Sequence, residues 1–174
     1  MNGEVFWVAA TAIASWALVA STIVMINKQL SRGRLDLQMR QQSDFEDKFD
    51  GTALIAERKK LATQLLSGTT HADIQEAVIN FFESVGIMLR KGYLEKEMVW
   101  AGFSYFAIRW WSACKDYITE ERRLRKNDNT IFEDFQYLVD ELYAFEVKRR
   151  SMKRIDLEPS VGDIKVFLEE EKNL

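Results

Sequence analysis

An uncharged stretch near the N-terminus constrains this chain more than any other feature. From Val5 to Ile26, 22 consecutive residues carry no charge and include many Ala, Val, Ile and Trp. As an α-helix the stretch would be about 33 Å long, which is enough to cross a bilayer once. A cleaved signal peptide, the main alternative, begins with basic residues, whereas this chain begins Met1-Asn2-Gly3-Glu4. We therefore expect a transmembrane helix over 5–26.

The charges that flank this stretch predict its orientation. No Lys or Arg precedes it, and a short N-terminus over 1–4 would lie outside the cytoplasm. Basic flanks stay on the cytoplasmic side, and they can also contact anionic lipids, so the bilayer is an expected partner. The residues expected to set the topology or contact lipid are Lys28, Arg32, Arg34 and Arg40.

Small residues recur along one face of the expected transmembrane helix. Their spacing of four, three and four residues would let two such helices approach closely. This possible packing face consists of Ala10, Ala14, Ala17 and Ser21.

The rest of the chain has the apolar spacing of helices, with no alternating run typical of a strand. Residues 27–49 are polar and predict a juxtamembrane stalk, and 50–152 predict an all-α bundle of about four helices.

Local signals predict where the helices of the bundle end and begin. Gly68 and Gly92 are expected to end the first two helices, and Thr130 with Glu133 is expected to form a capping box that opens the fourth. Residues 153–174 predict a linker and a short helix. The expected helices are 52–66, 71–90, 95–125, one from Thr130 onward, and 160–172.

Composition excludes much chemistry. With one histidine and one cysteine, the chain cannot build a histidine or cysteine metal cluster by itself, and no phosphate loop or hydrolase motif is present. His71 is expected to be solvated or to cap a helix, and Cys114 to be a small core residue. We expect no catalytic residue, no cofactor and no metal.

Nucleic-acid binding is the weakest of the function classes considered. The net charge is −3, and a Glu169–Glu171 run offsets the basic cluster at 148–154. The helix dipole by itself favours cations at the C-terminal end of a helix, so the basic cluster needs no nucleic acid to explain it.

Seven aromatic residues fall between Trp100 and Tyr117. Most share one helical stripe and are expected in the core, whereas Tyr105 and Trp111 deviate from it. These two residues are the candidate partner surface, because exposed aromatic side chains are typical of interfaces.

The order of several motifs resembles a known family. Asn80-Phe81-Phe82-Glu83, Arg90-Lys91-Gly92, Trp100 and Trp110 follow the apolar stretch. This order resembles a family of uncharacterised bacterial, membrane-anchored proteins, a domain of unknown function, over about 50–147. The resemblance implies a helical fold and a bacterial origin, and it supplies no catalytic residues. Together with the expected transmembrane helix, it predicts a location in the bacterial inner membrane. Asn80, Glu83 and Gly92 are the candidate shared site.

These observations favour a non-enzymatic, membrane-anchored interaction or scaffold module that binds another protein or its own copy. The alternative is a small-molecule sensor or enzyme with a pocket between helices near Asn80 and Glu83.

Overall fold

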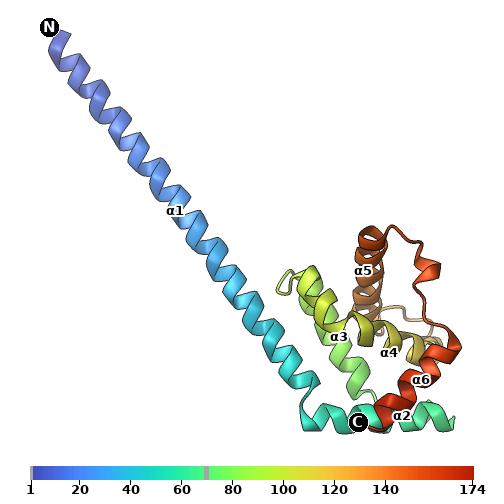
Figure 1. Ribbon diagram of the computed structural model, residues 1–174. Coiled ribbons are helices and arrows are strands. Elements are labelled where there is room, and N and C mark those ends of the chain that lie inside the picture. The colour runs from blue at the N-terminus through green and yellow to red at the C-terminus, as the bar shows by residue number, and fades with distance from the viewer. Residues whose placement is uncertain (1, 69–70) are drawn as a thin grey trace. The chain divides into compact units, whose positions relative to one another are not determined.

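The computed structural model describes residues 2–68 and 71–174, with side chains except at 2–21, 23, 31, 32, 34 and 72. All regular elements among these residues are helical, which confirms an all-α fold (Figure 1). The α-helices are α1 (Asn2–Phe49), α2 (Thr52–Ser67), α3 (Ala77–Arg90), α4 (Lys96–Leu124), α5 (Glu133–Arg150) and α6 (Val161–Lys172); η1 (His71–Asp73) and η2 (Arg154–Asp156) are short 3-10 helices.

The expected transmembrane helix over 5–26 needs correction. Among the residues searched, which are those the structure describes, no helix combines the length and apolar character needed to cross a membrane. This finding contradicts the transmembrane helix, and with it the single-pass inner-membrane location with the N-terminus outside.

The chain divides into two units, Met1–Met39 and Arg40–Leu174. The second unit contains the hydrophobic core, and it begins ten residues before the expected bundle boundary at 50. Phe49 is buried, and its ring lies 4.8 to 5.8 Å from those of Phe81, Phe103 and Phe106. The last turns of α1 therefore belong to the bundle and not to a separate stalk.

The core confirms the main apolar stripes of the sequence. Val99, Phe103, Trp110 and Cys114 of α4 are fully buried or nearly so. Helix α3 packs closely on α5 at Gly86, where an added Cβ would overlap the backbone carbonyl of Asp134. A residue without a side chain is needed there, because the two backbones leave no room for one.

Both predicted glycine ends are present, but two helix starts differ. Gly68 and Gly92 follow α2 and α3 with φ of 66° and 72°, the left-handed conformation typical of glycine at a helix end. Helix α3 begins at Ala77 and not near 71, because His71–Asp73 forms the 3-10 turn η1.

The capping box expected at Thr130 and Glu133 does not form. The Thr130 hydroxyl donates to Asp128 Oδ1 at 2.7 Å, and α5 begins only at Glu133, after Phe132 in a left-handed conformation. A carboxylate from another helix caps α5 instead, as described below.

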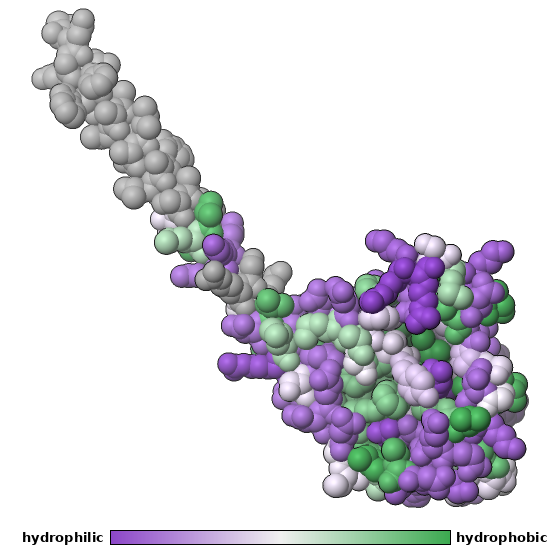
Figure 2. All heavy atoms as spheres, viewed as in Figure 1, coloured by the Kyte–Doolittle hydropathy of each residue, from purple (hydrophilic) through white to green (hydrophobic). Residues whose placement is uncertain are grey.

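The predicted C-terminal helix is present as α6, and it packs along α2 (Figure 1). Ser160 and Asp163 form a capping box at its start. Phe167 and Leu168 are buried, so α6 completes the core. The face of the second unit in Figure 2 is mainly hydrophilic, with apolar side chains in patches between the charged ones.

Candidate interaction site

An open groove of about 810 Å³ lies in the second unit, between the end of α2, the middle of α4 and the segment that leads into α6. The helices that frame it are positioned by the core below. Its lining residues are Gln64, Leu65, Gly68, His71, Ile74, Trp111, Ser112, Ala113, Lys115, Asp116, Tyr117, Tyr143, Arg154, Glu158, Pro159, Val161, Ile164 and Leu168.

Trp111 gives the groove a rigid aromatic surface. Its ring packs edge-on against buried Phe135, with centroids 5.2 Å apart. Leu65, Ile74 and Ile164 also line the groove and pack partly against the core. An apolar floor held by the core is the surface from which interface anchors are built.

One wall of the groove is a stacked pair of rings. His71 lies on Tyr117 with ring centroids 4.6 Å apart, and its Nε2 is 3.5 Å from Glu121 Oε1. The Tyr117 hydroxyl donates to Glu76 Oε1 at 2.6 Å. Burial, together with this bond to Glu76, raises the pKa of Tyr117 well above its usual value, so the phenol remains a hydrogen-bond donor.

The opposite edge is formed by the segment before α6. The Arg154 guanidinium pairs with Asp140 at 2.8 Å and with Glu158 at 3.6 Å, and it lies 4.5 Å from the ring centroid of Tyr143. These contacts hold the segment at the groove. The rim also carries Lys115 and Asp116, which are exposed and form no ion pair with any described residue.

The two predicted partner residues do not form one surface. Trp111 lines the groove, whereas Tyr105 does not. The Tyr105 side chain is 47% exposed, and the Arg109 guanidinium lies 3.7 Å from its ring centroid. Of the pair, Trp111 is the residue that the groove includes.

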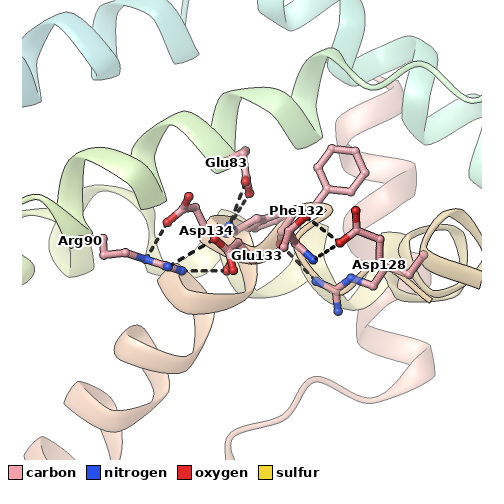
Figure 3. A network of polar contacts seen from close by, with 9 residues as sticks. Glu83, Arg90, Asp128, Phe132, Glu133 and Asp134 are labelled. Atoms are coloured by element: carbon pink, nitrogen blue, oxygen red, sulfur yellow. Dashed lines mark hydrogen bonds and ion pairs between the residues drawn. The ribbon is translucent and has the colours of Figure 1, made fainter. Parts of the chain in front are cut away.

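Glu83, a candidate for the shared family site, caps another helix. Its carboxylate accepts hydrogen bonds from the backbone amides of Phe135, at 2.6 Å, and Asp134, at 3.3 Å, in the first turn of α5 (Figure 3). A carboxylate at a helix N-terminus satisfies free amides and complements the dipole. Burial nevertheless raises the pKa of Glu83 above its ordinary value.

Arg90 strengthens the same junction about two turns further along α3. Its Nε lies 2.7 Å from Asp134 Oδ1, and its Nη2 donates to the Glu133 carbonyl (Figure 3). Together with Gly86, Glu83 and Arg90 join α3 to the start of α5. This arrangement fixes the start of α5 against α3.

Asn80 and Gly92 are not part of the cap that Glu83 forms on α5. Asn80 is exposed, and its carbonyl accepts a hydrogen bond from Ser84. Gly92 ends α3. None of Asn80, Glu83 and Gly92 lines the groove.

Of the predicted N-terminal residues, the structure describes the side chains of two. The side chains of Ala10, Ala14, Ala17, Ser21, Arg32 and Arg34 lie outside those described, and Lys28 and Arg40 are exposed.

Two polar pairs that the structure shows are not predicted from the sequence. Arg58 pairs with Glu171 with both side chains 4% exposed, and the Trp100 indole donates to Glu146. A signal was present, because Arg58 shares the stripe of Leu54 and Leu61, and Glu171 that of Ile164 and Phe167. A charge on an apolar stripe predicts a buried partner.

The remaining candidates for chemistry are structural. Cys114 is fully buried, which raises the pKa of its thiol to about 12 and keeps it protonated. The described residues include no group of three or more His, Cys, Asp or Glu that could hold a metal ion. In the basic cluster, Arg150 pairs with Glu146, and Arg149 stacks on Trp100.

The family comparison covers most of the chain. The model of DUF4760, a domain of unknown function, matches residues 5–142. No curated protein and no solved structure matches. Because the matched residues make up well over half of the sequence, the chain belongs to the DUF4760 family.

Proposed function

We propose that this protein is a non-enzymatic interaction module whose groove, lined by Trp111, binds a segment of another protein. The observation that carries this proposal is the groove itself. It combines a core-supported apolar floor with an aromatic wall and a rim bearing the opposite charges of Lys115 and Asp116.

The engagement of titratable side chains supports a binding role over a catalytic one. Glu83 caps α5, Arg58 and Glu171 pair with each other, and the Cys114 thiol stays protonated in the core. General acid–base or nucleophilic catalysis needs a group that is free to react and within reach of a substrate. Glu83, Arg58 and Glu171 instead hold one helix against another, and Cys114 is enclosed in the core.

Affinity purification with crosslinking tests the proposal. Asp116→Arg reverses a charge on the rim of the groove, whereas Glu97→Arg makes the same change at an exposed position of α4 outside it. We expect the wild-type chain and Glu97→Arg to recover the same partner, and Asp116→Arg to lose it. A chain that recovers no partner, or equal recovery by all three, contradicts the proposal, and a bound small molecule favours the sensor alternative.

A further inference from the structure

Helix α6 contacts the bundle as a ligand helix contacts a groove. Its inward residues are Ile164, Phe167, Leu168 and Glu171, at positions i, i+3, i+4 and i+7. Phe167, Leu168 and Glu171 are at most 6% exposed. This spacing is the one by which amphipathic helices dock into hydrophobic grooves.

The surface beneath α6 is formed by α2 and α4. The Phe167 ring meets Trp110 edge-on, with centroids 5.2 Å apart. Arg58 of α2 is the other main residue of this surface, and its guanidinium is stacked 4.1 Å from the ring centroid of Phe49. We call this surface, defined by Arg58 and Trp110, the α2–α4 site.

Arg58 makes the α2–α4 site selective for a carboxylate. Its Nε and Nη2 each lie 2.7 Å from one Glu171 oxygen, and its Nη1 donates to the Phe49 carbonyl at 3.3 Å. A bidentate pair fixes the position and angle of the acid. A helix without an acid there would leave the Arg58 charge buried and unpaired, which is strongly unfavourable.

Three observations indicate that α6 is not the best possible occupant. The Trp110 indole N–H is buried without a hydrogen-bond partner, so α6 offers it no acceptor. Ser151 to Asp156, in the linker to α6, are all exposed, and of these only Arg154 is described above as holding the segment, through Asp140 and Glu158. The family match also ends at 142, so the α2–α4 site lies within it while α6 lies beyond it.

We propose that the α2–α4 site binds an amphipathic helix of a partner protein, with apolar residues at i, i+3 and i+4 and a carboxylate at i+7, and that α6 occupies the site as a displaceable intramolecular ligand. The inference rests on the proposed function only in that both make the chain an interaction module. The partner helix displaces α6, pairs its acid with Arg58 and places an acceptor near Trp110.

A labelled peptide of residues 159–174 tests the site in the full chain. Glu171→Gln in the chain weakens the α6 contact and leaves Arg58 intact, whereas Glu170→Gln makes the same change on the exposed face of α6. Apparent affinity rises with the fraction of open sites, so we expect at least about tenfold tighter peptide binding by Glu171→Gln than by wild type. Glu170→Gln should behave as wild type.

The peptide itself provides the matched control. A peptide carrying Glu171→Gln should bind the Glu171→Gln chain at least about tenfold more weakly than the native peptide, because it offers Arg58 no charge. Hydrogen exchange of α6 amides in the wild-type chain should quicken with excess peptide, which keeps the test valid if the variant chain is unfolded.

Three outcomes overturn the inference. These are no peptide binding with unchanged α6 exchange, equal binding by the two variant chains, and a concentration-dependent dimer that exchanges α6 between copies. Ile164 and Leu168 of α6 also line the open groove, so the groove is complete only while α6 is docked. The three outcomes concern only the displacement of α6, whereas Asp116→Arg tests the groove with α6 docked.

Discussion

At the scale of single residues, charges on helices hold neighbouring helices together. Glu83, named from the sequence as a candidate shared-site residue, satisfies two backbone amides at the start of α5. Gly86, one turn further along α3, removes the side chain that would separate the two helices. The junction therefore depends on three α3 positions, Glu83, Gly86 and Arg90.

Gly86→Ala should destabilise the domain. The added methyl group would overlap the Asp134 carbonyl, and overpacking of this kind costs about 1–3 kcal/mol. Gly162→Ala in α6 is the control, because its Cβ would meet only Ser160 Oγ at 3.6 Å, an ordinary contact. Urea unfolding should show a lower free energy of unfolding for Gly86→Ala alone, and equal midpoints for the two variants would contradict the close packing.

Glu83 should make stability depend on pH. Burial raises its folded-state pKa above the ordinary value, so the folded protein binds this proton more tightly than the unfolded chain does. The resulting stabilisation is present below the ordinary pKa and is lost as pH rises through the raised one. The unfolding free energy of wild type minus that of Glu83→Gln should therefore fall as pH rises above the ordinary pKa of 4.5 and through the raised one. A difference that rises with pH would show that the amide hydrogen bonds outweigh burial.

Cys114 should be unreactive in the folded chain. Its thiol is fully buried with a pKa raised to about 12, so almost no thiolate is present near neutral pH. A thiol reagent such as DTNB should modify Cys114 only when the protein is unfolded in denaturant. Rapid modification of the native protein would contradict the burial.

At the scale of elements, α6 depends on one buried ion pair. Removing either partner leaves the other charge buried, so Arg58→Leu and Glu171→Leu should each cost about 3–5 kcal/mol. The double variant should recover most of that loss, because no unpaired charge remains. A double-mutant cycle by urea unfolding measures this coupling, and additive single losses would show that the two side chains act independently.

The same elements show what the sequence could predict. Helices α2, α4 and α6 follow from periodicity and from Gly68 and Ser160, which are local signals. The start of α5 could not be predicted, because its cap comes from Glu83, 50 or more residues earlier in the chain. Trp111 stands out in the sequence because it leaves the main stripe. Its neighbours in the groove come from other segments of the chain, and no local sequence pattern relates those segments to it.

At the scale of the whole molecule, the second unit should fold without the first. Residues 40–174 contain the whole described core, so this fragment should unfold with the same urea midpoint as the full chain. Fragment 50–174 should be less stable by about 3–5 kcal/mol, because it lacks Phe49 at the centre of the aromatic cluster. Equal stability of the two fragments would place the boundary at 50, as the sequence suggested.

The Arg58–Glu171 pair also sets an order of events during synthesis. The two partners are 113 residues apart in the chain, so the ribosome releases Arg58 long before it makes Glu171. Until then, the α2–α4 surface has an exposed Trp110 ring beside a cation without its carboxylate. The nascent domain is thus an incomplete fold whose α2–α4 surface stays uncovered until α6 emerges.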